Sequence, residues 1–393
     1  MKKIVAYAKI DSYETPSLLR EALQKVLAPQ LESFGSVKGK KILIKPNLLV
    51  WKGKGEIASV HPAVIVETAA LFLDEGAARV DIREIPAVQT AHSIIHAMGI
   101  GEKLEKMGVN VGGFEKYSPI STKEAKEKIV FHNLELASEF QEYDAVVDLA
   151  KAKTHGMMTF TFCVKNLFGL IRGSERLSWH LAVGKDFLLF ADMLLDLYLA
   201  VKPHFNILDG IVCMEGNGPG SGTPAERGFI AGSSDALALD DSVAGLFGMK
   251  KIPLLIQAEK RGLIPEYEEK GKETLSCKPL LLPDPPGLLC EWGVFLPPFL
   301  KTLFRNILIS RPELDGEKCV SCGLCAKMCP PKSLKLIHGK PVFDLKNCIR
   351  CYCCQEHCPK SAITPRKSFF MKIGSCVEKI LEKLFGKGRK LTP

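Results

Sequence analysis

The sequence predicts an α/β domain with a mainly parallel sheet and crossover helices, followed by a small α+β domain that is rich in cysteine. Two observations lead to this prediction. Over residues 1–285, short β-rich runs alternate with helical patterns, which is typical of crossover units on a parallel sheet. Beyond a proline-rich stretch, nine of the 14 cysteines fall between Cys319 and Cys358. A chain of 393 residues has room for two or three domains.

Strands and helices alternate along the predicted α/β domain. Strands are expected where aliphatic and β-branched residues dominate, at residues 3–9, 41–45, 79–84, 129–134, 145–149 and 205–211. Helices are expected at residues 17–34, 62–75, 101–107, 187–201 and 236–247. Pro29 should end or kink the first helix, because proline lacks the N–H group that a helix interior uses.

Composition shifts divide the chain into four segments. They are the α/β domain at residues 1–285, a proline-rich linker at 286–312, the cysteine-rich domain at 313–366 and a basic tail at 367–393. Apolar residues recur at helical spacing in the tail, with lysines between them. Such an amphipathic helix can pack on a domain, enter a protein groove or contact an anionic membrane surface. We favour packing on the cysteine-rich domain over membrane contact.

Hydrophobic residues make up 46% of the chain and charged residues 25%, as in ordinary soluble globular proteins. The N-terminus lacks the long apolar region of a secretory signal. The apolar passages at residues 187–200 and 293–300 are shorter than the 18 or so residues of a spanning helix. We therefore expect a cytoplasmic protein. Because the cytosol keeps thiols reduced, the clustered cysteines are expected to hold metal and not to form disulfides.

The cysteines form the motif Cys-x2-Cys-x2-Cys-x3-Cys-Pro twice, beginning at Cys319 and at Cys348. Three closely spaced thiolates can bind three corners of a [4Fe–4S] cubane, while the fourth cysteine, beside proline, ligates the other cluster. The expected ligand sets are Cys319, Cys322, Cys325 and Cys358 for one cluster, and Cys348, Cys351, Cys354 and Cys329 for the other. The motif resembles bacterial two-cluster ferredoxins. Zinc is the alternative, but it usually takes paired CxxC units, so two [4Fe–4S] clusters are predicted.

The other cysteines fall outside this register. Cys353 adjoins a ligand and is expected to be a packed thiol near the cluster, or an alternative ligand. Isolated cysteines are more often core residues than ligands. The isolated ones are Cys163, Cys213, Cys277, Cys290 and Cys376.

The formal charge of +9 invites a nucleic-acid role, but two corrections weaken it. Each cluster with four thiolates carries about −2, which lowers the total to about +5. Between Arg366 and Lys390 there are eight basic residues against two glutamates. The body of the protein is close to neutral, so no nucleic-acid partner is expected.

Polar residues follow several predicted strands. In open α/β sheets, ligands bind outside the carboxyl ends of the strands. Lysines there could neutralise an anionic small molecule, a histidine could move a proton, and a glutamate could act as a base or metal ligand. The candidates are Lys45, Asn47, Lys151, Lys153, His155, Lys165, Asn166 and Glu215.

A glycine-rich loop follows Glu215 and could offer backbone N–H groups to an anion. Its glycines are Gly216, Gly218, Gly220 and Gly222. The loop lacks the Gly-Lys-Ser/Thr ending of a P-loop, so it could also be a simple turn. Likewise, single lysines at strand ends are usually solvated, and a lone histidine is more often structural. No HxH or HExxH spacing suggests zinc.

Several dispersed motifs resemble the domain-of-unknown-function 362 (DUF362) family. They are Lys45-Pro46-Asn47, Ser59-Val60-His61-Pro62, Lys151-Ala152-Lys153-Thr154-His155, Val164-Lys165-Asn166-Leu167-Phe168-Gly169, and Asp209-Gly210 through Glu215-Gly216-Asn217-Gly218-Pro219. Members often carry a C-terminal ferredoxin-type module. The resemblance implies an α/β domain associated with iron–sulfur chemistry. It implies no particular reaction, because the family has no settled activity.

The sequence thus leads to a redox hypothesis with two alternatives. The cysteine-rich module would relay electrons between a redox partner protein and an anionic-ligand site in the α/β domain, as in an oxidoreductase that uses low-potential electrons. In the first alternative, the chain is a non-catalytic carrier or adaptor whose lysines, including Lys151 and Lys153, dock a partner enzyme. In the second, it is a non-redox enzyme whose clusters are structural.

Overall fold

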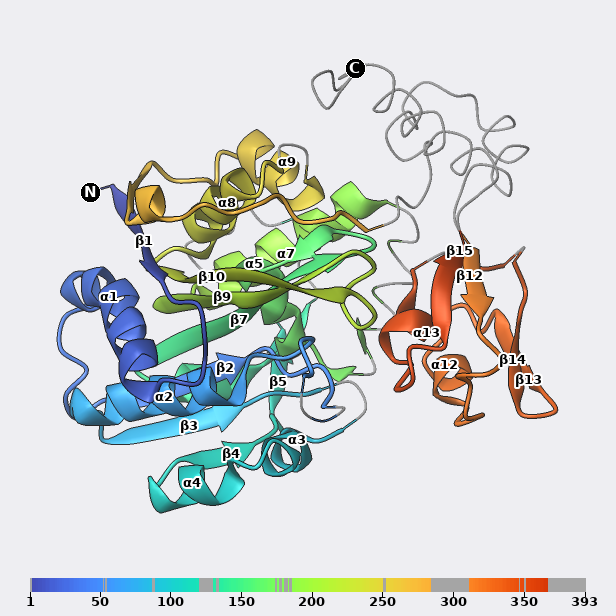
Figure 1. Cartoon of the computed structure of the whole chain (residues 1–393), viewed down its shortest axis with the longest axis horizontal. Coiled ribbons are helices and arrows are strands. Elements are labelled where there is room, and N and C mark those ends of the chain that lie inside the picture. The colour runs from blue at the N-terminus through green and yellow to red at the C-terminus, as the bar shows by residue number, and fades with distance from the viewer. Residues whose placement is uncertain are drawn as a thin grey trace. The chain divides into compact units, whose positions relative to one another are not determined.

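The computed structural model describes residues 2–283 and 311–366, apart from 52, 54, 87–88, 120–129, 132–133, 174, 177–178, 180–182, 184–185, 250–251, 346 and 350. The chain divides into two compact units, Met1–Pro283 and Asp284–Pro393, and each has its own strands and core (Figure 1). The expected tail and nearly all of the expected linker lie outside the described residues. Only residues 311 and 312 of that linker are described, and they belong to a strand.

The first unit is built on a nine-stranded mixed sheet with the strand order β11-β1-β10-β9-β7-β2-β3-β4, to which β8 adds by pairing with β7. Strands β9, β7, β2, β3 and β4 run parallel, whereas β10 is antiparallel to both of its neighbours. The predicted mainly parallel α/β fold is therefore confirmed. The strands are β1 (Lys3–Lys9), β2 (Lys41–Pro46), β3 (Arg79–Arg83), β4 (Asn110–Gly112), β7 (Ala145–His155), β8 (Thr159–Thr161), β9 (Phe205–Glu215), β10 (Thr223–Ser233) and β11 (Tyr267–Lys270).

Helices cover both faces of this sheet, which explains why all 11 residues of β7 are buried. On one face, α1 and α2 form a core with Ile42 and Ile44 of β2. Leu43 points the other way and is buried as well. Helix α5 packs against α7, α8 and β7, while α8 also packs on β10. The helices are α1 (Pro16–Phe34), α2 (Pro62–Asp74), α3 (Ala91–Ala97), α4 (Gly101–Lys106), α5 (Cys163–Asn166), α7 (Phe187–Val201), α8 (Ala236–Leu246) and α9 (Pro253–Lys260).

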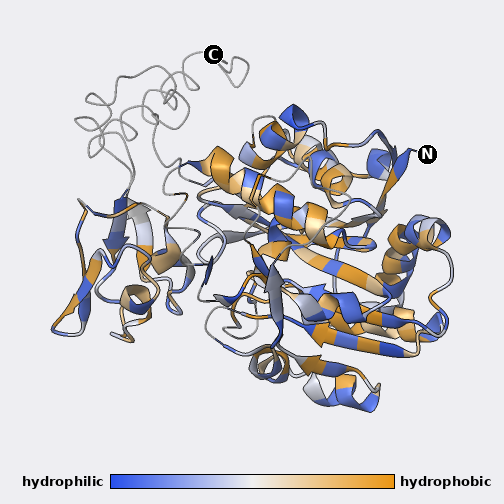
Figure 2. Ribbon diagram, turned by 180° about the vertical axis from the view of Figure 1, so that it is seen from behind, coloured by the Kyte–Doolittle hydropathy of each residue, from blue (hydrophilic) through white to orange (hydrophobic). Residues whose placement is uncertain are grey.

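Hydrophobic residues, orange in Figure 2, are concentrated in the central strands and along the helices that cover the sheet. Beside the large sheet, β5 (Tyr117–Pro119) and β6 (Glu135–Ala137) form a separate antiparallel pair. Three short 3₁₀ helices occupy Ser138–Glu142, Leu167–Leu170 and Lys272–Thr274. Within the described ranges, no helix is long and apolar enough to cross a membrane.

Most predicted elements are present, and three details of the predictions are wrong. Helix α1 continues through Pro29 to Phe34, so proline does not end it. Residues 130, 131 and 134 of the expected strand at 129–134 are not in a strand, and β6 begins at Glu135. Strands β7 and β9 continue well beyond their expected ends. The reason is that β8 pairs with Lys153–His155, and β10 pairs with β9 as far as Glu215.

The second unit is a small α+β arrangement, as predicted. Strand β12 (Arg311–Leu314) pairs with β15 (Ile363–Arg366), and β13 (Leu334–Ile337) pairs with β14 (Lys340–Phe343). Two short helices, α12 (Leu324–Lys327) and α13 (Cys353–Glu356), each follow a group of cysteines. Its core contains Leu334 and Ile363 together with Cys325 and Cys329.

Backbone conformation repeats in the two halves of this unit. Gly323 and Tyr352, each one residue after the second cysteine of its motif, both have positive φ, at 73° and 58°. Lys332 and Ser361, each three residues after the fourth cysteine, have φ values of 52° and 47°. Left-handed residues place sharp turns at matching positions, so the sequence duplication is also a structural one.

Candidate functional site

Polar side chains meet at the carboxyl edge of the large sheet, where β2, β3, β7 and β9 end. Parallel strands present their carboxyl ends on the same edge, which brings together residues far apart in sequence. Three lysines here are almost fully buried: Lys45 at 0% exposed, and Lys151 and Lys153 at 2% each. A buried charge must be hydrogen-bonded or paired, so the partners of these lysines define the site.

Lys45 is held by a carboxylate and an amide. Its Nζ lies 2.5 Å from Glu84 Oε2 and 3.3 Å from Asn166 Oδ1. Glu84 follows β3 and is itself only 4% exposed. Gly169 lies against this pair, since a Cβ there would be 2.3 Å from Glu84 Oε1 and 2.9 Å from Lys45 Nζ. Glycine at 169 therefore gives the buried ion pair its space.

A chain of hydrogen bonds runs from Lys153 to Asp148 through two amides. Lys153 Nζ donates to Asn47 Oδ1 at 2.7 Å and to the carbonyl of Ala58. Asn47 Nδ2 donates to Asn166 Oδ1 at 2.9 Å, and Asn166 Nδ2 donates to Asp148 Oδ1 at 2.6 Å. Each amide thus has its orientation fixed by a donor on one side and an acceptor on the other.

Asp148 ends this chain inside the protein. It is fully buried, and its Oδ2 has no hydrogen-bond partner of ordinary geometry among the described residues. Burial raises the pKa of Asp148 to about 7, while the nearby Lys45 ammonium acts in the opposite direction. This carboxyl can therefore exchange a proton near neutral pH. Sequence reasoning missed it, although an acidic residue inside the apolar strand at 145–149 is a visible signal.

A second group forms around Asp209 of β9. Its Oδ1 accepts a hydrogen bond from the Tyr13 hydroxyl at 2.8 Å, and its Oδ2 accepts from Lys151 Nζ at 2.8 Å and from the backbone N–H of His61 at 3.1 Å. Lys151 also donates to the Tyr13 oxygen at 2.9 Å. The Tyr13 ring stacks on the His61 ring, with centroids 3.7 Å apart and planes 11° apart.

Burial decides the protonation states of the two stacked rings. It raises the pKa of Tyr13 well above its usual value, and the Asp209 carboxylate raises that pKa further. Burial lowers the pKa of His61, which leaves its imidazole neutral near pH 7. Tyr13 was absent from the residues selected from sequence. It follows β1, whose carboxyl end lies at the same edge as those of β7 and β9.

Three of the residues selected from sequence make contacts elsewhere. His155 is buried, and its Nδ1 accepts hydrogen bonds from the backbone of Met157 and Met158 at 3.0 and 3.3 Å. Glu215 accepts from Arg227 at 2.9 Å and from a backbone N–H at 3.1 Å. Lys165 lies over the Phe168 ring, 5.5 Å from its centroid. Of the selected residues, hydrogen bonds join Lys45, Asn47, Lys153 and Asn166 in one network, whereas Lys151 belongs to the group around Asp209.

The glycine-rich loop packs against the end of β7. A Cβ at Gly218 would lie 2.1 Å from the carbonyl oxygen of Thr154, and the Thr154 hydroxyl donates to the Gly216 carbonyl at 2.8 Å. The N–H groups of Gly216 and Gly218 donate to the carbonyls of Leu281 and Gly216, at 2.7 and 2.9 Å. These two N–H groups are therefore already bonded within the protein. A Cβ at Gly222 would lie 2.4 Å from the Glu215 carbonyl oxygen, and an anion-binding role for Gly220 and Gly222 stays a prediction.

Eight cysteines of the second unit line two separate pockets, four in each. The first pocket is lined by Cys319, Cys322, Cys325 and Cys358. The second is lined by Cys329, Cys348, Cys351 and Cys354. The fourth cysteine of each motif thus lies with the first three of the other. Cys353 is 1% exposed and lines neither pocket.

These pockets have the chemistry that an iron–sulfur cluster needs. Their walls include apolar residues such as Leu314 and Ile363 in the first and Leu334 and Phe343 in the second. Burial raises the pKa of Cys354, and the neighbouring Cys351 and Cys348 raise it further by like-charge repulsion. Four thiolates so close together require a positively charged core between them, and iron supplies it.

The two units together define a class of protein: an α/β unit with a polar site at the carboxyl edge of its sheet, joined to a small unit with two cysteine pockets. Residues 42–245 match the family described as Domain of unknown function (DUF362), and the chain belongs to this family. Residues 311–359 match a 4Fe-4S dicluster domain, which supports an iron–sulfur electron-transfer role.

Known proteins show further similarities. A thylakoid-associated protein of Synechocystis is 31% identical over 314 residues, which cover 79% of this chain and 96% of that protein. Among solved structures, lactate racemase apoprotein from Thermoanaerobacterium thermosaccharolyticum is 16% identical with a TM-score of 0.40, covering 63% of this chain and 58% of that one. A protein from Thermotoga maritima is 12% identical with a TM-score of 0.38, covering 65% and 61%.

Proposed function

We propose that this chain is an iron–sulfur redox protein in which two [4Fe–4S] clusters exchange electrons between a redox partner protein and a ligand bound in the α/β unit. One observation carries the proposal: eight cysteines divide four and four between two apolar pockets, with the fourth cysteine of each motif in the opposite pocket. Bacterial-type ferredoxin motifs use this crossing to hold two clusters. When bound, each cluster supplies one-electron chemistry.

The ligand sets follow from the pockets. Cys319, Cys322, Cys325 and Cys358 hold one cluster, and Cys348, Cys351, Cys354 and Cys329 hold the other. Hydrogen bonds to the sulfurs tune reduction potentials. The N–H of Ala362 donates to Cys358 Sγ at 3.2 Å, and the Ser333 hydroxyl lies 3.4 Å from Cys329 Sγ. These two contacts lie four residues after the corresponding cysteines, so each cluster has one.

The ligand site in the α/β unit lies at the carboxyl edge of the sheet. Tyr13, Asn47 and His61 are partly exposed there, and the buried Lys151 and Lys153 are bonded directly to Tyr13 and Asn47. Three lysine ammonium groups stand against the carboxylates of Glu84 and Asp209 and against Asp148, which is half protonated near pH 7. The balance is positive, which favours a small anionic ligand such as a carboxylate or a phosphate ester.

Each group has a definite task in this proposal. The partly exposed side chains of Tyr13 and Asn47 contact and orient the ligand, and the lysine charges behind them stabilise its negative charge. Asp148 takes up or releases a proton near neutral pH, and the amides of Asn166 and Asn47 connect it to Lys153. Electron transfer to or from a small anion usually requires such a proton. This would make the chain an oxidoreductase.

Burial argues against the docking alternative in its original form. Lys151 and Lys153 are each 2% exposed, so they cannot present their charges to a docking protein. A redox partner would instead have to contact other surfaces of the chain. Structural clusters in a non-redox enzyme are the other alternative, and cluster oxidation distinguishes it, because turnover would then persist without electron exchange.

The crossed ligand sets are tested by substitutions made in two stages. Replacing Cys319, Cys322 and Cys325 with serine should remove one cluster and leave about four iron atoms per chain. On that background, Cys358→Ser should cause no further loss, because its cluster is already gone. Cys329→Ser should instead destabilise the remaining cluster. Cys353→Ala in the otherwise unchanged chain is the control and should keep both clusters.

The ligand site is tested with the dithionite-reduced, cluster-loaded chain. It is mixed anaerobically with small carboxylates and phosphate esters that carry a reducible carbonyl group or carbon–carbon double bond, and the return of oxidised-cluster absorbance is recorded. At least one compound should reoxidise the wild-type clusters, and Lys153→Met should slow that reaction without changing the iron content. Lys103→Met, at an exposed lysine of α4, is the control. If all compounds leave the reduced clusters unchanged, the relay is wrong although the clusters stand.

A further inference from the structure

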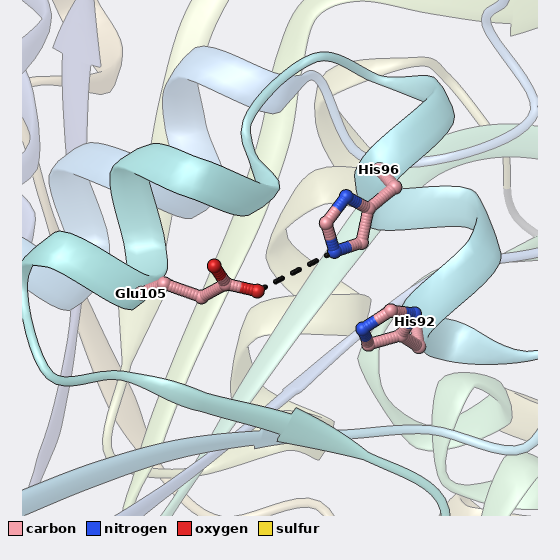
Figure 3. Close-up of side chains that lie close together, drawn as sticks. All are labelled: His92, His96 and Glu105. Atoms are coloured by element: carbon pink, nitrogen blue, oxygen red, sulfur yellow. Dashed lines mark ion pairs between the residues drawn. The ribbon is translucent and has the colours of Figure 1, made fainter.

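Two histidines and a glutamate lie together on the surface of the first unit, and none of them belongs to the sites described above. His92 and His96 belong to α3, and Glu105 belongs to α4 (Figure 3). A capping box fixes where α3 begins, because Thr90 Oγ1 accepts from the Ser93 N–H at 3.1 Å and Ser93 Oγ accepts from the Thr90 N–H at 3.1 Å. The two histidines, four residues apart, therefore share one face of the helix.

The turn between the helices brings Glu105 to this face. His96 Nε2 lies 3.5 Å from Glu105 Oε1, and the His92 and His96 ring centroids are 4.3 Å apart. One ligand atom from each of the three side chains lies within 4.8 Å of the other two. Gly101 makes room for this arrangement, because a Cβ there would be 2.8 Å from His96 Cε1 and Nδ1.

We propose that His92, His96 and Glu105 form a binding site for a divalent transition-metal ion of the Zn²⁺ type. Imidazole nitrogen and carboxylate oxygen bind Zn²⁺ at about 2.0–2.2 Å, and three such protein ligands leave a further position open to water. Two imidazoles disfavour Ca²⁺ and Mg²⁺, which take oxygen ligands. All three side chains are exposed, so the ion can enter from solvent with no rearrangement of the core.

A bound ion would join α3 to α4 directly. In its absence, His96 and Glu105 contact each other directly. Zn²⁺ would bind both side chains and add His92 as a third ligand. The site therefore tightens the segment that connects β3 to β4. Sequence inspection missed it because the third ligand lies on another helix, outside any compact zinc motif.

The test uses the full chain loaded with its clusters under anaerobic conditions, so that the cysteines are not available to zinc. After equilibration with Zn²⁺ and dialysis, one zinc per chain is expected, and zinc-edge X-ray absorption should show nitrogen and oxygen neighbours only. Zn–N and Zn–O distances near 2.0–2.2 Å separate them from Zn–S near 2.3 Å.

Matched variants locate the ion. His92→Gln, His96→Gln and Glu105→Gln should each weaken Zn²⁺ binding by more than about 100-fold, since even the loss of an outer partner costs about 10- to 100-fold. Glu102 is an exposed residue of α4, the helix of Glu105, and it pairs with Lys106. Glu102→Gln should leave binding unchanged. Gly101→Ala keeps all three ligands but should weaken binding by displacing the His96 ring.

Three results would overturn the proposal. They are no zinc retained by the cluster-loaded wild type, zinc surrounded by sulfur, and equal affinities in wild type and the three ligand variants. Thermal unfolding of each variant without zinc separates a lost site from a damaged fold. The ligands are exposed, so all three variants should melt within a few degrees of the wild type.

Discussion

Lys45 and Glu84 form an ion pair in the interior of the first unit, with exposures of 0% and 4%. Breaking such a pair leaves one charge unpaired in a medium of low polarity, at a cost of roughly 3–5 kcal/mol. Lys45→Met should therefore lower the free energy of unfolding by about that amount, measured by urea titration of the full chain. Adding Glu84→Met to the same chain should recover much of the loss.

An exposed pair provides the control for this prediction. Glu21 and Lys25 of α1 lie 2.9 Å apart with side chains 59% and 64% exposed. Water screens such a pair, so Glu21→Gln should change the free energy of unfolding by less than about 0.5 kcal/mol. A similar small effect for Lys45→Met would show that the interior pair is not formed as described.

Asp148 should make stability depend on pH. Burial raises its pKa to about 7 in the folded state, whereas an exposed aspartate titrates near 3.9. Between these two values the folded state binds more protons than the unfolded state. The free energy of unfolding should therefore fall as pH rises from about 4 to about 7 and then level off, by an amount on the order of 4 kcal/mol.

Asp148→Asn removes this titration and should flatten that part of the stability profile. Urea titrations of the full chain at several pH values between about 5.5 and 8 would show the difference in slope. The pKa of Asp240 is also raised well above its usual value, first by burial and in part by Asp148, so the variant lowers this pKa as well and flattens the profile in the same direction. Parallel profiles for wild type and variant would mean that Asp148 is already ionised at the lower pH.

At the scale of single elements, β7 determines the site. The sequence predicts a strand at residues 145–149 followed by a polar loop, and the structure instead continues β7 to His155. Lys151 and Lys153 could not be recognised as strand residues, because charged side chains ordinarily lower strand propensity. Their burial depends on β8, β9 and the partners Asn47 and Asp209, which only the folded sheet brings near.

Gly169 lies in the 3₁₀ helix that follows α5, and it provides a test of close packing. An alanine methyl group there would overlap Glu84 Oε1 and press on Lys45 Nζ. Gly169→Ala should lower the free energy of unfolding by about 1–3 kcal/mol, as overpacking of a buried site does. It should also weaken ligand binding at the carboxyl edge.

Gly173 offers the matched control, since a Cβ there would meet nothing within 4 Å. Gly173→Ala should leave the urea midpoint of the full chain nearly unchanged. If both variants behave alike, the space around the buried ion pair is larger than the structure shows, and Gly169 has no special role.

At the scale of the whole molecule, sequence patterns with fixed spacing were the most informative. The doubled cysteine motif predicted the two groups of four cysteines that line the two pockets, because in motifs of this spacing the fourth cysteine joins the first three of the other motif. The fold class could likewise be predicted, because the alternation of strand and helix patterns is a local periodicity of the sequence. Tyr13 joins the site only through contacts with distant segments, which no local pattern encodes, whereas Asp148 was visible as an acidic residue inside an apolar strand.

The proposed relay would join the two units functionally, and its first requirement is that the clusters exist. Iron and acid-labile sulfide should be measured on anaerobically purified, reconstituted full chain, with EPR of the dithionite-reduced form. We predict about eight iron and eight sulfide per chain, with signals from two interacting reduced clusters. Zinc in place of iron, or no cluster signal after careful reconstitution, would contradict the proposed function.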